Sequence, residues 1–230
     1  AAHFLAKELK LKRAALITSS SEWTWSEQRG TFEKSFLKLE GSVSIDLRFK
    51  TATELSEGLC SQILGAKSEA VVFAGHPNDL QAMLSSLTRV HAKLPIIYLT
   101  SLDEEQSILQ NPSSFGGIYV TTPVAFDGTS TKFPAKFLEK FKKYPTTRAA
   151  LAFDSVKLIA EGLKKSKTGL ATRVVTELGN ADQLQIETST GPAKLAANHS
   201  LARPVFVAEC GGGKLRKVFS KSPETTLSKE

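Results

Sequence analysis

The chain has 230 residues, of which 41% are hydrophobic and 23% are charged. This composition is that of an ordinary globular protein with one large or two small domains, and it excludes a disordered or collagen-like chain. The longest uncharged apolar runs, such as Ala70–Ala74, are far shorter than the about 20 residues of a membrane-spanning helix. The first residues contain neither an initiator Met nor the apolar stretch of a signal peptide, so we expect a mature or excised segment.

The positive charge is concentrated in the second half of the sequence. Residues 1–122 contain 12 Lys and Arg against 13 Asp and Glu, a net charge of −1, whereas residues 123–230 contain 18 against 10, a net charge of +8. A basic half suggests nucleic-acid binding. However, Lys136, Lys140 and Lys143 follow helical spacing beside phenylalanines, which is typical of a solvated helix face. Because no nucleic-acid-binding motif accompanies the charge, we expect no nucleic-acid partner.

The first 122 residues alternate between predicted helices and predicted strands. In chain order, the pattern of apolar residues predicts a helix at 2–11, a strand at 13–18, a helix ending near 39, a strand at 42–49, a helix at 54–64, a strand at 70–74, a helix at 80–90, a strand at 95–99, a helix at 102–109 and a strand at 117–121. Thr51 and Thr53 are candidate helix caps, and Ser101 with Glu104 forms a predicted capping box. Five strands separated by helices predict a parallel sheet that helices cover on both faces.

After Pro123 this alternation stops. The remaining pattern predicts, in chain order, helices at 133–144, 148–166 and 170–178, followed by short strands at 184–187, 205–210 and 215–219. We therefore divide the chain into a domain at 1–122 and a second domain at 123–230. The second domain has few and short predicted strands for its helices to pack against. We therefore expect its helices to pack against a larger sheet, with strands beyond those that these residues supply.

The loops that follow the predicted strands indicate a binding site rather than a catalytic one. Parallel sheets bind ligands at the carboxyl ends of their strands, and here those loops are Ser19–Trp25, Gly75–Asp79 and Thr100–Asp103. They contain hydroxyl groups, an imidazole, two indoles and helix N-termini, which suit a small-molecule cleft.

Other candidate chemical motifs point to no catalysis, no metal and no cofactor. The serines at 19–21 have neither a nucleophile elbow nor a partnered His, the four His have no zinc-binding spacing, and Gly211–Lys214 lacks the spacing of a phosphate-binding loop. Cys60 and Cys210 are expected to be two free thiols.

Several stretches resemble one known family. Ala150–Leu158, with the sequence Ala-Leu-Ala-Phe-Asp-Ser-Val-Lys-Leu, resembles the family's Tyr-Asp-Ala-Val helix, with Phe153 in place of Tyr. Phe115–Val120 resembles its Glu-Gly-Val segment, and Thr190–Pro192 resembles its Gly-Pro-Ile turn. In order and spacing, nearly all of residues 1–219 resembles the later two-thirds of the type I periplasmic solute-binding proteins, the leucine/isoleucine/valine-binding family and its receptor relatives.

The resemblance implies a fold and a division of the chain. It implies an α/β protein of the type I periplasmic-binding class, with two hinged lobes that close over a solute. Residues 1–122 correspond to lobe 2, a five-stranded parallel α/β domain, and residues 123–230 correspond to the C-terminal part of lobe 1 with the hinge crossover. The N-terminal part of lobe 1 is expected as a missing segment that precedes residue 1 or is supplied by another chain.

The resemblance also implies ligand-binding residues, all of them near the expected carboxyl edge: Ser20, Ser21, Trp23, His76, Thr100 and Ser101. An indole such as that of Trp23 stacks on a solute or binds a cation. Three of these residues also have an alternative role that is purely structural: Trp23 packs on its own loop, His76 is a turn residue, and Ser101 caps a helix. Thr100 and Ser101 replace the acid that binds the ligand ammonium in amino-acid-binding relatives.

The function that the resemblance implies is non-catalytic binding of a small polar solute in an interlobe cleft for ABC-type uptake. The solute class is an amino acid, an amide or a small carboxylate, and the partner is a membrane permease or a signalling module in a periplasmic or extracellular location. One alternative is a sensory or structural protein-interaction domain of the same fold that has lost or changed its ligand. Another is an enzyme on a doubly wound sheet, for which the sequence shows neither a nucleophile–base pair nor a phosphate loop.

Overall fold

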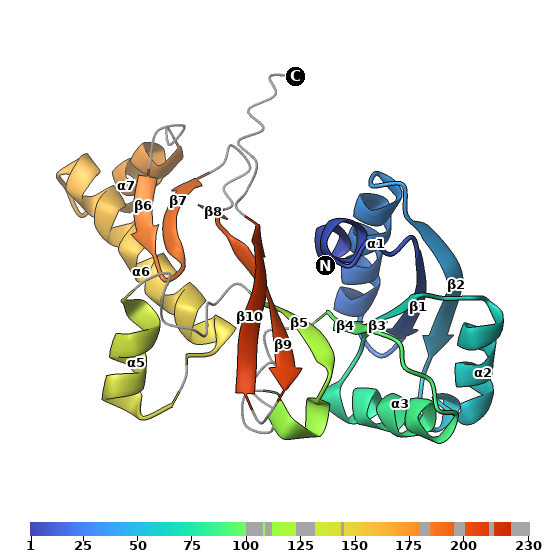
Figure 1. Ribbon diagram of the computed structural model, residues 1–230. Helices are drawn as coiled ribbons and strands as arrows, with labels where there is room; N and C mark the ends of the chain where they lie inside the picture. The colour runs from blue at the N-terminus through green and yellow to red at the C-terminus, as the bar shows by residue number, and fades with distance from the viewer. Residues whose placement is uncertain are drawn as a thin grey trace. The chain divides into compact units, whose positions relative to one another are not determined.

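The chain forms two compact units, which are described separately (Figure 1). The computed structural model describes residues 1–99, 108, 112–122, 132–143, 145–179, 185–195, 201–211 and 214–221. Unit 1 comprises Ala1–Thr121 and Val207–Phe219, and unit 2 comprises Thr122–Phe206 and Ser220–Glu230.

A seven-stranded sheet, most of which belongs to unit 1, has the strand order β10-β9-β5-β4-β3-β1-β2. Its strands are β1 (Arg13–Ser19), β2 (Ser42–Phe49), β3 (Ala70–Ala74), β4 (Ile96–Tyr98), β5 (Ile118–Thr122), β9 (Val205–Gly211) and β10 (Lys214–Lys221). The pairs β1–β2, β1–β3, β3–β4 and β4–β5 are all parallel. The carboxyl ends of β1–β5 therefore lie at one edge of the sheet, which we call the carboxyl edge. These findings confirm the predicted α/β class and the five predicted parallel strands.

The last two strands extend this sheet beyond the predicted five. β9 lies beside β5 in the sheet although more than 80 residues separate them in the sequence, and β10 lies beside β9. The sequence interpretation kept all of residues 123–230 in one domain, whereas the structure places Val207–Phe219 in unit 1. A local hydrophobic pattern identifies such strands but carries no information about a partner so far away in the chain.

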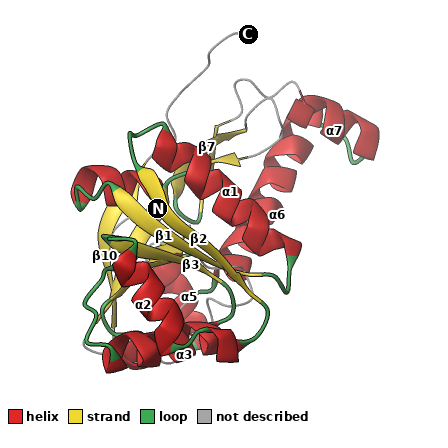
Figure 2. Ribbon diagram, turned by 90° about the vertical axis from the view of Figure 1, so that its right-hand side faces the viewer, coloured by secondary structure: helices red, strands yellow, loops and turns green. Residues whose placement is uncertain are grey.

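Helices cover both faces of the sheet in unit 1 (Figure 2). Alternate strand residues point to opposite faces, so Leu16 and Val72 join one core cluster while Ile17 and Phe73 join the other. The first cluster includes side chains of the π-helical turn η1 (Phe4–Glu8) and of α1 (Trp23–Leu37), and the second includes side chains of α2 (Glu57–Gly65) and α3 (Pro77–Arg89). Unit 1 also contains two 3-10 turns, η2 (Ala52–Glu54) and η3 (Pro112–Phe115), among its described residues.

The helix predicted at 54–64 is divided in the structure. Thr51 and Glu54 form a capping box, in which the Glu54 carboxylate accepts hydrogen bonds from the backbone nitrogens of Lys50 and Thr51 at 3.1 Å each. This box closes only the short turn η2, because Leu55 leaves helical geometry with φ −80° and ψ 52°. A separate helix, α2, begins at Glu57. The predicted helix 102–109 with its Ser101 cap lies almost entirely outside the described residues.

The described part of unit 2 combines three helices with a small antiparallel sheet. Its helices are α5 (Phe133–Phe141), α6 (Thr147–Ser166) and α7 (Ala171–Gly179), and its sheet has the order β6-β7-β8, formed by β6 (Gln185–Thr188), β7 (Gly191–Leu195) and β8 (Leu201–Ala202). The helices and β6 were predicted, whereas β7 and β8 were not. No helix within the described ranges is long and apolar enough to cross a membrane.

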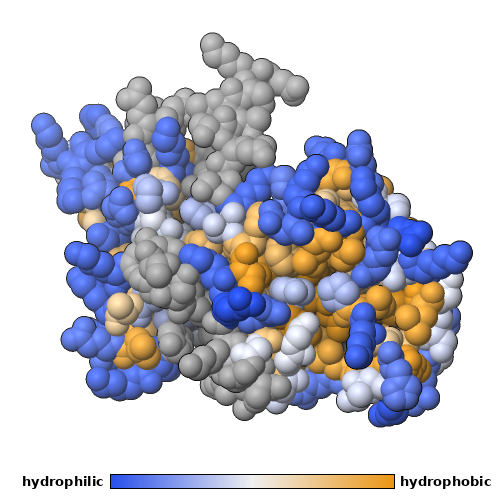
Figure 3. Space-filling model, viewed as in Figure 1, coloured by the Kyte–Doolittle hydropathy of each residue, from blue (hydrophilic) through white to orange (hydrophobic). Residues whose placement is uncertain are grey.

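Helix α6 carries apolar side chains on two opposite sides. On one side, Leu158 packs into the core cluster of unit 2 with residues of β6 and β7. On the other side, Val156, Ile159 and Leu163 recur at helical spacing and expose 67%, 53% and 43% of their surface. On α5, Phe141 is also half exposed, and Figure 3 shows hydrophobic residues there among hydrophilic ones. Unit 2 therefore leaves a substantial apolar surface uncovered.

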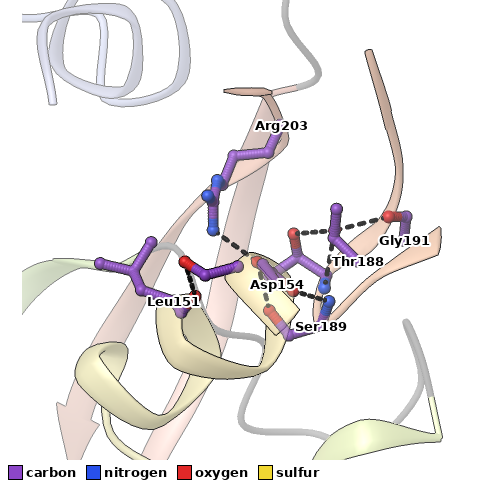
Figure 4. Close-up of polar contacts among 8 residues, drawn as sticks. Leu151, Asp154, Thr188, Ser189, Gly191 and Arg203 are labelled. Atoms are coloured by element: carbon purple, nitrogen blue, oxygen red, sulfur yellow. Dashed lines mark hydrogen bonds and ion pairs between the residues drawn. The ribbon is translucent and has the colours of Figure 1, made fainter. Parts of the chain in front are cut away.

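A buried carboxylate connects α6 to the small sheet of unit 2 (Figure 4). Asp154 is 1% exposed and accepts hydrogen bonds from the Ser189 backbone nitrogen at 2.5 Å and from the Ser189 hydroxyl at 3.0 Å. Arg203 Nη1 lies 2.7 Å from the second carboxylate oxygen and forms an ion pair with it. The neighbouring Thr188 hydroxyl donates to the Gly191 carbonyl at 2.6 Å, which closes the turn between β6 and β7. Asp154 thus holds three segments of unit 2 together.

We expect Asp154→Ala to lower the free energy of unfolding of unit 2 by about 3 kcal/mol, because it leaves the partly buried Arg203 guanidinium and the buried Ser189 amide without this acceptor. Ser155→Ala is the matched control on the next, exposed position of α6 and changes stability by less than about 0.5 kcal/mol. Both tryptophans lie in unit 1, so the measurement is denaturant unfolding followed by circular dichroism, with hydrogen exchange of α6. Equal stability of the two variants would show that the ion pair does not hold unit 2 together.

We expect both thiols to be unreactive in the folded protein. Cys60 and Cys210 are free, as predicted, and the structure shows that both are fully buried. Burial raises the pKa of Cys60, and burial together with the charge of Glu209 raises the pKa of Cys210 to about 12. Because the thiolate is the reacting form, Ellman's reagent should modify neither thiol in mildly alkaline buffer until denaturant is added. Rapid modification of the native protein, assigned with Cys60→Ala and Cys210→Ala, would contradict this burial.

Candidate functional site

The loop after β1 contains a compact set of hydroxyl groups at the carboxyl edge. Ser19 is buried at the end of the strand, and its hydroxyl lies 2.8 Å from the hydroxyl of Ser21. The backbone nitrogen of Ser20 donates to the Phe49 carbonyl at 2.8 Å, which continues the parallel ladder between β1 and β2 by one residue. The loop is therefore fixed on the sheet while the side chains of Ser20 and Ser21 remain exposed.

Two tryptophans at the start of α1 have opposite environments. The helix begins at Trp23, after Glu22 in the extended N-cap position. Trp23 exposes 74% of its surface, whereas Trp25 is completely buried. Positions two apart on a helix differ by about 200° in direction, which sends one indole to solvent and the other into the core. Among the described residues, the Trp25 indole nitrogen Nε1 is buried without a hydrogen-bond partner.

His76 connects the loop after β3 with the loop after β1. It is the N-cap residue of α3, Pro77 occupies the first helical position, and the Leu80 backbone nitrogen donates to the His76 carbonyl at 3.0 Å. Its Nε2 lies 3.5 Å from Glu22 Oε1, and its ring centroid lies 5.7 Å from that of Trp25 at an interplanar angle of 82°. Side chains from two loops and two helix N-termini therefore meet at this point.

Buried aromatic rings support the loop after β3. The Tyr98 hydroxyl donates to the Gly75 carbonyl at 2.8 Å, and Phe73 packs between Phe49 and Tyr98 with ring centroids 5.7 and 6.0 Å away. A Cβ at Gly75 would lie only 3.0 Å from the Phe49 ring. Glycine at this position thus lets the loop approach the rings closely, which fixes the backbone that precedes His76.

Four of the six predicted ligand-binding residues belong to segments of the carboxyl edge that the structure describes: Ser20, Ser21 and Trp23 follow β1, and His76 follows β3. Thr100 and Ser101 lie outside the described residues. Sequence reasoning did not assign a role to Glu22, whose carboxylate faces His76, or to Tyr98, which anchors Gly75. The only sequence signal for Glu22 is its position directly before a tryptophan in a carboxyl-edge loop. A ligand-binding role for all of these residues remains a prediction.

The chemistry of this edge suits hydrogen bonding and stacking. It offers serine hydroxyls, an exposed indole, an imidazole, one carboxylate and the N-termini of α1 and α3, which carry partial positive charge. In the described ranges, His, Cys, Asp and Glu side chains form no group of three that could hold a metal ion. The Asp154 cluster of unit 2 is different, because its charges are paired with each other and it is buried.

Comparison with known proteins identifies the family and the fold. The model of the periplasmic binding protein family matches residues 1–214. No curated protein sequence gives a significant match. Leucine-binding protein LivK of Thermotoga maritima has a TM-score of 0.79 and 17% identity over 96% of this chain and 64% of its own.

Two further solved structures carry bound ligands. A solute-binding protein of an ABC transporter from Rhodopseudomonas palustris, in complex with benzoate, has a TM-score of 0.73 and 20% identity over 95% of this chain and 61% of its own. LivJ from Streptococcus pneumoniae, in complex with isoleucine, has a TM-score of 0.70 and 20% identity over 94% of this chain and 63% of its own.

These matches share two features. The chain spans less than two thirds of the length of each structure. The TM-scores establish a common fold of the type I periplasmic-binding class, and at these low identities the similarity shows the fold alone. The family model, in contrast, extends over most of the sequence. The chain therefore belongs to the periplasmic binding protein family.

Proposed function

We propose that the protein binds a small polar solute at the carboxyl edge of unit 1, without catalysis, for uptake by an ABC-type transporter. The observation that carries this proposal is the contact of His76, which follows β3, with Glu22 and Trp25, which follow β1. This contact brings together two segments of the carboxyl edge, one of which also contains Ser20, Ser21 and Trp23. Family membership supports it, because structures of the same fold are described as ABC transporter solute-binding proteins in complex with isoleucine or benzoate. The proposed solute class is an amino acid, an amide or a small carboxylate.

The arrangement of polar groups supports binding rather than covalent chemistry. The hydroxyls of Ser19 and Ser21 bond to each other, and His76 Nε2 lies 3.5 Å from the Glu22 carboxylate. A serine nucleophile needs a base within hydrogen-bond reach, and these contacts give the serines a different partner. Backbone groups at helix N-termini, an indole face and hydroxyls are groups that orient a small molecule in a pocket.

The uncovered apolar surface of unit 2 supports a further part of the proposal. Val156, Ile159 and Leu163 expose about half of their surface on the side of α6 that faces away from the unit 2 core. More than a third of each similar structure lies outside the part that these residues match. We propose that a further polypeptide segment covers this surface and completes a second lobe, and that a membrane permease or a signalling module is the partner, in a periplasmic or extracellular location.

The same apolar surface favours one alternative function. A domain of this fold that has lost or changed its ligand would act in sensing or in protein interaction, and exposed apolar patches are typical of such interfaces. The two functions differ in one measurable property, because only the first requires a solute to bind at the carboxyl edge.

We expect one class in a thermal-shift panel of amino acids, amides, small carboxylates, sugars and polyamines to stabilise the protein. A ligand that binds only the native state adds about 2.7 kcal/mol at 100 times its dissociation constant. With the solute identified, Trp23→Ala should weaken binding at least about tenfold, because it removes the exposed indole face. Leu37→Ala, an exposed position at the other end of α1, is the control and should leave affinity unchanged. A flat panel with folded protein would favour the interaction domain.

A further inference from the structure

We propose that a strip of phenylalanines on unit 2 docks on an anionic lipid surface. This aromatic strip consists of four residues on two helices: Phe133, Phe137 and Phe141 of α5 and Phe153 of α6. The proposal goes beyond the proposed function, because the strip lies in unit 2 and its docking requires no solute. The strip also differs from the apolar side of α6 for which we propose a covering segment, since three of its four rings lie on α5.

The four rings of the aromatic strip form a continuous row. The distance between ring centroids is 4.5 Å for Phe137 and Phe141, 5.7 Å for Phe133 and Phe137, and 4.7 Å for Phe133 and Phe153. Positions four apart on a helix lie on the same side, which aligns the three rings of α5. Despite these contacts, Phe141 exposes 51% and Phe153 exposes 37% of its surface. The row therefore presents apolar surface to solvent along two helices.

Lysines lie beside this row of rings. Lys140 Nζ is 5.6 Å from the ring centroid of Phe141, and Lys157 Nζ is 5.7 Å from that of Phe153. Residues 132–143 contain five lysines, all exposed, and one glutamate, which gives a net charge of +4. Among the described residues, the ion pairs of unit 2 involve none of these five lysines. The aromatic strip thus combines exposed rings with positive charge that no described carboxylate pairs with.

The charge of the neighbouring helices has the same sign. Residues 145–179 contain six Lys and Arg against three Asp and Glu, a net charge of +3, whereas residues 1–122 have a net charge of −1. Anionic lipids attract clusters of Lys that come within about a Debye length of the membrane surface. Lysine amines then contact the headgroups while adjacent apolar side chains enter the boundary of the acyl chains. Helix α5, with lysines beside phenylalanines and a leucine, has the composition that suits this position.

Two other anionic partners, a nucleic acid and an acidic protein, fit the strip less well. The bases of a single-stranded nucleic acid stack on open aromatic faces. Here the rings contact one another at interplanar angles of 38°, 41° and 52°, so they form a tilted row and not a flat platform. Protein interfaces are enriched in Arg and depleted in Lys, whereas residues 132–143 contain five Lys and no Arg. These observations favour a lipid surface.

The test is co-sedimentation of the full chain with vesicles of phosphatidylcholine, either alone or with about 30% phosphatidylglycerol. We expect binding to the anionic vesicles to be at least about tenfold stronger, and to be lost in about 1 M salt, where the Debye length is about 3 Å. Lys140→Gln combined with Lys143→Gln should weaken this binding at least about tenfold, because it removes two positive charges. Phe141→Ala should weaken it about fivefold, because it removes an apolar ring that enters the membrane interface.

Helix α1 of unit 1 supplies the matched controls, because Leu37 is 53% exposed and lies between the exposed Lys34 and Lys38. Leu37→Ala, and Lys34→Gln combined with Lys38→Gln, should leave vesicle binding unchanged, and circular dichroism checks that every variant is folded. Equal losses in the two lysine pairs, equal binding to both vesicles, or no binding to either would overturn the proposal. Binding to polyglutamate or to oligothymidylate without binding to vesicles would also overturn it, and would identify an acidic protein or a nucleic acid as the partner.

Discussion

The parallel hydrogen-bonded ladder of β2-β1-β3-β4-β5 is the constraint on which the rest of unit 1 depends. Every residue of β3 is buried, so the strand cannot move without opening both core clusters. Because all five strands run in the same direction, their following loops meet at one edge. That edge brings Glu22 and His76 together from positions more than 50 residues apart in the sequence.

The edge combines a rigid support with a polar surface. Beneath it, Phe49, Phe73 and Tyr98 pack against one another, and the Tyr98 hydroxyl holds the Gly75 carbonyl. Above them, polar side chains remain exposed, and Trp23 gains no stability from burial in unit 1. A large exposed indole lowers the solubility of a protein and does not stabilise its fold. This separation of buried and exposed aromatic rings is what a binding edge requires.

The sequence allowed prediction of the elements whose signal is local. The runs Ala70–Ala74 and Ser42–Phe49 coincide with β3 and β2, because burial and alternation are visible in neighbouring residues. The pairing of β9 with the first sheet and the short strand β8 were beyond prediction, since both depend on contacts between distant segments. The site shows the same limit. Loop position led to the prediction of Trp23 and His76 as ligand-binding residues, but the approach of Glu22 to His76 depends on side-chain directions that spacing does not encode.

Unit 2 is held together in a different way from unit 1. Among the residues that the structure describes, its core cluster contains two buried hydrophobic residues, Ile186 and Leu195, whereas each cluster of unit 1 contains many. Unit 2 thus gains little stability from apolar burial. Its Asp154–Arg203 ion pair also adds little net stability, but it fixes the geometry of the segments that it joins. Asp154 fixes α6 against the turn at Ser189, and this contact orients the opposite, apolar side of α6 toward the outside. The polar contact and the uncovered surface are therefore two consequences of one helix orientation, and a layer that covers Val156 and Ile159 would supply the apolar burial that unit 2 lacks on its own.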